Sequence, residues 1–203
     1  MRGTRRYPRE SAGPFPRPPR TVEDRDGREI ELEAVESDES VVDSLTRMYL
    51  QFDPADRAQG IPPTGEESIR NWLEPIVEHG ISVVARHEGE DSSVSAKNAG
   101  GFVGHTTLVP DVSDPETIDE PGDVEWELAI FVLQAYQRAG IGTALLETLL
   151  GHASELGVDR VWLTVERWNG PAIALYDRVG FETCGSESFD REMSIRLAGD
   201  EDE

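Results

Sequence analysis

The chain has 203 residues, enough for one domain with a hydrophobic core and too few for two large ones. Its formal net charge of -22 and isoelectric point near 4.4 argue against a nucleic-acid partner held by phosphate contacts and against docking on an anionic membrane. One cysteine cannot form an intramolecular disulfide, and the scattered histidines show no spacing of a metal site, so we expect no metal.

The basic residues are almost all arginines, and Lys97 is the only lysine. An excess of Asp and Glu with so little Lys is typical of proteins kept soluble by charge in strong salt, which indicates a halophilic source. An ordinary acidic cytosolic protein is the alternative. No apolar run is long enough to span a bilayer, and the N-terminus has no apolar signal region, so we expect a cytoplasmic protein without a membrane partner.

The first 27 residues are rich in Arg and Pro, and we predict a disordered extension there. The folded domain is predicted over residues 28–197. The last segment, residues 198–203, is predicted to be an acidic tail.

The domain is predicted to begin with a strand and two helices. Residues 28–35 alternate apolar and charged side chains, which is the period of a half-buried strand. Residues 38–52 and 66–80 each carry an apolar stripe at helical spacing. Pro75 lies inside the second helix, so we expect it to kink or split that helix.

Three strands and a long helix follow. Residues 81–86 and 100–109 read as strands joined by a polar hairpin loop. Residues 125–133 are more continuously apolar, which favours a strand near the middle of a sheet. After a turn rich in glycine, residues 140–156 show the apolar spacing of a helix packed on that sheet.

The C-terminal part continues with a strand at residues 159–166 and a short helix within residues 169–181. Pro171 suits the first turn of this helix, and Gly180 suits the position after its last turn. Residues 191–197 are predicted to close the sheet as an edge strand. The order of elements predicts a single mixed α/β (α+β) domain with helices packed on a central sheet.

The glycine turn, residues 137–143, lies between a strand and a helix. Positions without side chains let main-chain N–H groups converge on an anion at a helix N-terminus, and Arg138 can add a charged contact. The spacing of Gly140 and Gly142 fits neither the P-loop nor the dinucleotide fingerprint. A phosphate or pyrophosphate site and a purely structural glycine pair both stay open on the turn alone.

The segment "ELAIFVLQAYQRAGIGTALL" resembles the cofactor loop Q/R-x-x-G-x-G/A of the GNAT superfamily of N-acetyltransferases, with Gln137, Gly140 and Gly142 in register. The segment "NGPAIALYDRVGF" is similar to the family's N-x-x-A-x-x-L-Y-x-x-x-G-F segment. The resemblance is strong over residues 125–185, rests on element order over residues 29–110, and does not cover residues 1–27.

The resemblance implies a mostly antiparallel mixed sheet of about six or seven strands, splayed between the fourth and fifth and flanked by about four helices. It implies acetyl-CoA as co-substrate, with the fourth strand pairing with the pantetheine arm, the glycine loop holding the pyrophosphate, and Asn169 contacting the arm. The implied cofactor-binding residues are Ile130, Phe131, Val132, Gln137, Arg138, Ala139, Gly140, Ile141, Gly142, Thr143 and Asn169.

The resemblance also implies a catalytic pair. Tyr176 would lie near the thioester sulfur as the acid; an amphipathic tyrosine at a helix edge is the alternative. Glu127 would take the proton through water, unless it is only a solvated strand residue. The ribosomal-protein alanine acetyltransferases of the superfamily place a Glu where this chain has Thr164, so that assignment fails, and Glu166 is held in reserve.

The acceptor pocket is expected between residues 49–63 and 187–193, where Asp53, Asp56 and Arg57 are candidate contacts. Acidic walls favour a cationic amine, either a small molecule or a protein amine. We therefore expect an N-acetyltransferase acting by direct attack in a ternary complex, in a family whose members often dimerise. A non-catalytic acyl-CoA-binding sensor on the same fold and a nucleotide-binding α/β domain are the alternatives.

Overall fold

The computed structural model describes residues 5–52, 63–88, 101–186 and 189–198. Its strands are β1 (Arg20–Glu23), β2 (Glu29–Val35), β3 (Ile81–His87), β4 (Gly101–Pro110), β5 (Glu125–Val132), β6 (Arg160–Glu166), β7 (Glu182–Ser186) and β8 (Asp190–Arg196). Its helices are α1 (Glu39–Tyr49), α2 (Glu66–His79), α3 (Ile141–Glu155) and α4 (Gly170–Val179), with short 3-10 turns η2 (Pro115–Thr117), η3 (Pro121–Asp123) and η4 (Gln134–Tyr136).

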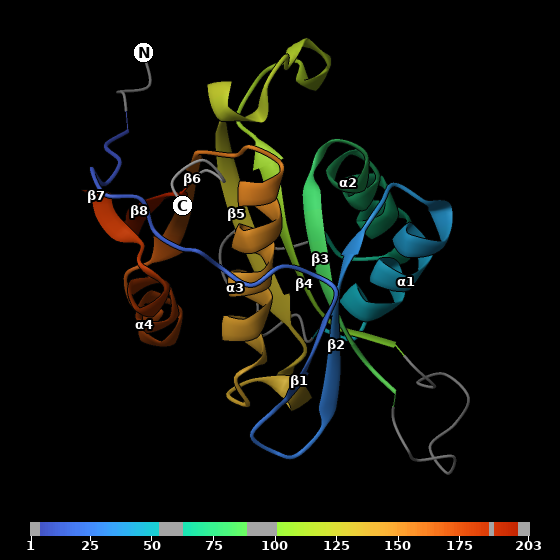
Figure 1. Ribbon diagram of the computed structural model, residues 1–203. Coiled ribbons are helices and arrows are strands. Elements are labelled where there is room, and N and C mark those ends of the chain that lie inside the picture. The colour runs from blue at the N-terminus through green and yellow to red at the C-terminus, as the bar shows by residue number, and fades with distance from the viewer. Residues whose placement is uncertain (1–4, 53–62, 89–100, 187–188, 199–203) are drawn as a thin grey trace.

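The described strands form one 8-stranded sheet in the order β1-β2-β3-β4-β5-β6-β8-β7 (Figure 1). Neighbours run antiparallel except β5 and β6, which are parallel. The predicted mixed, mostly antiparallel sheet with four flanking helices is confirmed for the described residues. The sheet has more strands than predicted because β1, inside the segment expected to be disordered, pairs with β2.

Alternate side chains of β5 reach opposite helix layers, as the strand period requires. The Phe131 ring packs against Tyr49 of α1 and Trp72 of α2, with ring centroids 5.3 and 6.3 Å away. The next residue, Val132, points to the other face, where α3 begins at the glycine turn. The sheet therefore separates an α1/α2 face from an α3 face.

Helix α2 continues through Pro75 as one helix, so the expected split does not occur. Pro75 is exposed, whereas Leu73 and Val77 on either side of it are buried. Burial of these flanking residues holds both turns in helical geometry despite the hydrogen bond that proline removes, because helices in proteins derive most of their stability from packing.

The N-terminal segment packs on the domain from residue 5 onward, which corrects the expected disordered extension. We call residues 5–19 the N-terminal strap. Ala12 forms a bridge to Leu197, with its N–H 2.8 Å from the Arg196 carbonyl oxygen. The strap then crosses α3 (Figure 1), where Gly151 leaves room for it: a Cβ there would lie 2.3 Å from the Pro16 carbonyl oxygen. Composition gave no sign of this because the strap is held by main-chain bonds and close backbone contact.

Strand β8 lies between β6 and β7, so the predicted edge position of residues 191–197 is wrong. It pairs with β6 from Arg160↔Arg196 to Glu166↔Asp190, and its Met193 and Ile195 are completely buried. The actual edge strand, β7, is short, mostly exposed and bulged, which suits an edge because it discourages pairing with another chain.

Candidate active site

The central feature is the parting of β5 and β6. These two strands pair only from Glu125↔Arg160 to Glu127↔Trp162. Beyond that point β5 continues along β4 as far as Val132, and β6 continues along β8 as far as Glu166. This is the splay that was predicted between the fourth and fifth strands.

The backbone of β5 has alternate groups directed into this opening. The N–H of Leu133 donates to the Val103 carbonyl oxygen over 2.9 Å, and the Ala129 carbonyl accepts from Thr106 Oγ1 over 3.1 Å, so these residues face β4. By alternation, the main-chain groups of Ile130 and Val132 face the opening. The main chain of Phe131 faces β4, so of the three predicted residues only Ile130 and Val132 present backbone toward the gap.

The glycine turn starts α3 as predicted. Gly140 is the residue before the first helical turn, in the left-handed region with φ 98°, and its carbonyl accepts from the N–H groups of Thr143 and Ala144 at 3.1 and 3.2 Å. The N–H groups of Ile141 and Gly142 belong to the first turn, where a helix supplies no partner of its own. The Ala139 and Ile141 side chains are buried, so these residues can offer a ligand only their main chain.

Gly142 is the point where three predicted segments meet. A Cβ placed on it would lie 3.7 Å from Leu175 Cδ2 of α4 and 4.0 Å from Val132 Cγ2 of β5. These are ordinary van der Waals distances, so the protein itself does not require glycine here. The end of β5, the glycine turn and α4 thus come together at the start of α3.

The turn between β1 and β2 braces the glycine loop, a contact that no pattern in the sequence indicated. The Arg25 N–H donates to the Ala139 carbonyl oxygen over 2.9 Å, and Arg28 Nη1 donates to the Ala135 carbonyl oxygen over 3.1 Å. Arg28 also lies 4.3 Å above the Tyr136 ring. Burial alone would raise the pKa of Asp24, but hydrogen bonds from Arg28 and Asp26 lower it. Asp24 therefore stays ionised and holds Arg28 in place against the glycine loop.

Helix α4 carries the two other motif residues. Asn169 caps it, with Oδ1 accepting from the Ala172 N–H over 3.2 Å, which leaves the amide NH2 for another partner. Tyr176 is 8% exposed, and its ring lies 5.7 Å from that of Phe181. Burial raises the pKa of Tyr176 to about 12, so the phenol stays protonated near neutral pH. Gly180 ends the helix in the left-handed region, as predicted.

Glu127 lies at the mouth of the splay. It is the last β5 residue paired with β6, opposite Trp162, and its side chain is exposed rather than partly desolvated as expected. By alternation it shares the α1/α2 face with Phe131. Thr164, two residues beyond Trp162, is also exposed on this face. Glu166 is half-buried and lies at the far end of β6, opposite Asp190.

An aromatic cluster covers the α1/α2 face beside the opening. Tyr49 lies 5.7 Å from Phe52 and 5.4 Å from Trp72 between ring centroids. Its Oη is 2.8 Å from Nδ1 of His105, and burial lowers the pKa of His105 to about 3, so the imidazole is neutral. From the sequence, His105 was only one of the scattered histidines, although its place among apolar residues of β4 was a signal of burial.

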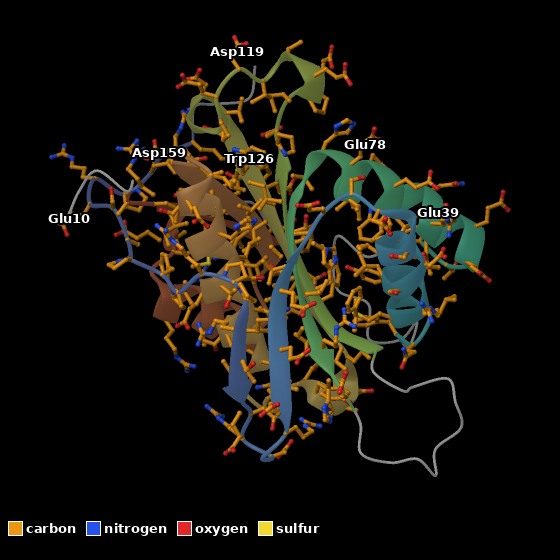
Figure 2. All side chains as sticks on the ribbon, turned by 45° about the vertical axis from the view of Figure 1, so that its right-hand side comes forward. Glu10, Glu39, Glu78, Asp119, Trp126 and Asp159 are labelled. Atoms are coloured by element: carbon orange, nitrogen blue, oxygen red, sulfur yellow. The ribbon has the colours of Figure 1, made fainter. Side chains whose placement is uncertain are left out.

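The predicted acceptor contacts Asp53, Asp56 and Arg57 lie outside the described residues. Surface acidity does not mark the acceptor face, because the carboxylates labelled in Figure 2 lie on widely separated parts of the molecule: Glu10, Glu39, Glu78, Asp119 and Asp159. Within the described ranges, no three His, Cys, Asp or Glu residues are grouped to hold a metal ion. Nor does that part of the chain contain a helix of the length and apolarity needed to cross a membrane.

Comparison with known proteins gives a family match. Residues 45–181 match the model of the acetyltransferase (GNAT) family. The [ribosomal protein bS18]-alanine N-acetyltransferase of Escherichia coli K12 is 50% identical over 46 residues, which is 23% of this chain and 31% of that protein. The N-alpha-acetyltransferase of Sulfurisphaera tokodaii is 43% identical over 56 residues, 27% of this chain and 34% of the relative. The chain thus spans only about a third of the length of these curated relatives.

Solved structures share the fold. The GNAT domain of S. lividans PAT superposes with a TM-score of 0.65 over 88% of this chain and 96% of that chain, at 18% identity. The Salmonella typhimurium protein yncA, solved with its cofactor acetyl-CoA, gives 0.58 over 82% of this chain and 94% of that chain, at 17% identity. At these identities the likeness establishes the fold and nothing finer.

Proposed function

The chain belongs to the acetyltransferase (GNAT) family, and on that basis we propose that it transfers an acetyl group from acetyl-CoA to a primary amine by direct attack in a ternary complex. The observation that carries the proposal is the opening between β5 and β6, which lies against the unpartnered first turn of α3 at Gly142. We assign the activity to residues 28–197.

The opening fits the pantetheine arm of the donor. Ile130 would pair with its amides as an added strand would, and the Asn169 NH2 group would donate to it. The Val132 carbonyl oxygen already accepts from Gln137 Nε2 over 3.0 Å, so Val132 offers the donor only its N–H. The N–H groups of Ile141 and Gly142 would take the pyrophosphate at the helix N-terminus, with Arg138 adding charge. A Cβ at Gly142 would meet Leu175 and Val132 only at ordinary van der Waals distances, so internal packing does not explain the glycine, which supports this placement.

The chemistry follows from the same groups. The amine nitrogen attacks the thioester carbonyl, and the Val132 N–H stabilises the developing oxyanion. Because burial raises the pKa of Tyr176 to about 12, its phenol would donate a hydrogen bond to the departing thiolate rather than give up its proton fully. The proton lost by the amine would pass through water to Glu127, which lies at the mouth of the opening.

A non-catalytic acyl-CoA-binding sensor is the second candidate. Two observations favour it: Glu127 is exposed rather than held in a desolvated site, and Thr164 replaces a carboxylate of one branch of the family. The E. coli relative acts on a ribosomal protein alanine by its name, but it matches over too short a segment to carry its acceptor to this chain.

The test is release of free CoA thiol from acetyl-CoA with a panel of small amines and peptide N-termini, with the acetylated acceptor identified by its mass. Turnover on any amine supports the transferase. Acetyl-CoA binding without turnover across the panel favours the sensor. The absence of acetyl-CoA binding would refute both.

We also propose a halophilic source, supported by the charge of -22 and the single lysine. Thermal unfolding measured from low to molar salt checks it: stability should rise steadily with salt, because added ions screen the repulsion between carboxylates. A flat dependence would indicate an ordinary acidic protein.

A further inference from the structure

Arg5 of the strap is held in a cage of carboxylates over an indole ring. Its guanidinium carbon lies 3.3 Å from the centroid of the Trp162 ring. Nη1 is 2.6 Å from Glu125 Oε2 and 2.9 Å from Asp111 Oδ2, and Nε is 3.9 Å from Glu192 Oε1. We call Trp162, Glu125, Asp111 and Glu192 the cation cage. Its composition combines charge-assisted hydrogen bonds with a cation–π contact, both of which suit a guanidinium.

The cage lies beside the proposed site of transfer. Trp162 is the cross-strand partner of Glu127 at the last pair before β5 and β6 part. Glu125 is two residues from Glu127, so both carboxylates lie on the α1/α2 face of β5. Arg5 therefore lies on the same face of the sheet as Glu127, over the strand pair at which the opening begins.

The cage also holds a buried hydrogen-bond donor that Arg5, which has no acceptor atom, leaves without a partner. Trp162 is 5% exposed, yet its Nε1–H has no hydrogen-bond partner among the described residues. A buried donor without a partner is costly, and such a group at a site edge points to a ligand that brings an acceptor atom.

The part of the strap that delivers Arg5 is attached by polar contacts. Ser194 Oγ donates to the Arg6 carbonyl oxygen over 2.7 Å, and the next backbone bridge is at Ala12. Apart from the stacking of Arg5 on Trp162, these are polar contacts that water or a ligand can replace.

We propose that the cation cage is the subsite for a guanidinium group of the acceptor and that Arg5 occupies this subsite in the free protein. This inference rests on the proposed function. The acceptor must then displace the strap, and its apparent affinity is reduced by the fraction of molecules in which Arg5 is bound. Free guanidinium amines and arginine side chains of peptides share this chemistry, and the test separates them.

The binding test uses the full-length protein and two guanidinium probes, agmatine and a tripeptide with a central arginine, with butylamine as the probe that lacks the guanidinium. Calorimetry compares wild type with Arg5→Ala, and with Arg9→Ala, which removes an exposed strap arginine that lies outside the cage. Arg5→Ala should bind one of the guanidinium probes at least about tenfold more tightly than wild type and Arg9→Ala. Which probe gains affinity identifies the source, and butylamine should gain none. Adding Trp162→Leu to Arg5→Ala should remove the gain.

Equal affinity of wild type and Arg5→Ala for both guanidinium probes would overturn the inference. If Arg5→Ala does not fold, agmatine should restore folding where butylamine does not, because a ligand of the folded state stabilises it. Failure of that rescue would equally overturn the inference.

Acetyl-CoA binding is measured on the same samples to separate the two proposals. If acetyl-CoA binds and Arg5→Ala gains no guanidinium affinity, only the cage inference fails. If acetyl-CoA does not bind, the transferase proposal fails, and a guanidinium site that nevertheless appears in Arg5→Ala belongs to another function.

Discussion

Tyr49 Oη lies 2.8 Å from His105 Nδ1, joining α1 to β4 inside the protein, where His105 is 0% and Tyr49 is 3% exposed. The pair lies under the aromatic cluster of the α1/α2 face, with Phe131 5.3 Å from the Tyr49 ring. The Tyr49–His105 hydrogen bond thus fixes the position of the aromatic cluster that lines the proposed acceptor pocket.

This pair predicts acid sensitivity. Burial lowers the pKa of His105 to about 3, against an ordinary value of 6.5, so between these values the unfolded chain takes up a proton that the folded chain refuses. The contribution to stability is present above pH 6.5 and is lost as the pH falls toward 3. Urea unfolding at pH 7 and 4.5 should show wild type losing about 2–3 kcal/mol more than His105→Gln, which does not titrate. Equal losses would contradict the assignment.

The glycine loop gives a second prediction. Gly142→Val should fold, because its Cβ meets only Leu175 at 3.7 Å and Val132 at 4.0 Å, but it should lose acetyl-CoA affinity by about 100-fold or more, since the added carbons fill the space for the pyrophosphate. Calorimetry measures the affinity and thermal unfolding checks the fold. Gly101→Val, at a glycine whose Cβ would have no heavy atom within 4 Å, is the control and should bind normally. Unchanged affinity in Gly142→Val would remove the pyrophosphate assignment.

Tyr176→Phe tests the leaving-group role. The ring contact with Phe181 remains, so stability should change by less than about 1 kcal/mol, while kcat should fall by about 10- to 1000-fold because the hydrogen bond to the thiolate is lost. Acetyl-CoA affinity should stay the same. Tyr136→Phe, at a partly exposed tyrosine outside α4, is the comparison. A Tyr176→Phe enzyme with normal kcat would show that the phenol only packs.

Glu127→Gln tests the base, with Glu166→Gln as its counterpart on β6. A role for Glu127 predicts a fall in kcat of about 100-fold or more in the first variant and little change in the second. Rates of thiol release across pH 6–9 provide the measurement. The reverse pattern would transfer the role to Glu166, and two unaffected variants would exclude both carboxylates.

Gly151→Ala tests the packing of the strap on α3. An alanine inside a helix normally stabilises by about 0.5–1 kcal/mol relative to glycine. Here the new Cβ would lie 2.3 Å from the Pro16 carbonyl oxygen, so the variant should instead be less stable and its strap should be cleaved faster in limited proteolysis. Gly170→Ala in α4, with no atom within 4 Å of its Cβ, should show no such loss. Stabilisation of Gly151→Ala would mean that the strap does not pack there in solution.

The sequence was sufficient for most of the elements and for the two motifs on which the proposed donor site rests. Strand and helix periods fixed most elements to within a few residues, because each period is a local property of consecutive side chains. The two motifs around Gly142 and Tyr176 were readable because each lies in one continuous segment. Their meeting at Gly142 followed from strand and helix order, and the structure confirms the splay beside it.

Only the tertiary structure decided the contacts between distant segments. The strap has no hydrophobic period, so nothing local predicted that Arg5 would reach Trp162 or that Arg25 would brace Ala139. The position of β8 beside β6 depends on which strand can form a complete set of backbone hydrogen bonds with it. The burial of His105 depends on the helices that cover β4. Such contacts are set by how the elements pack in space, which local propensity along the chain does not encode.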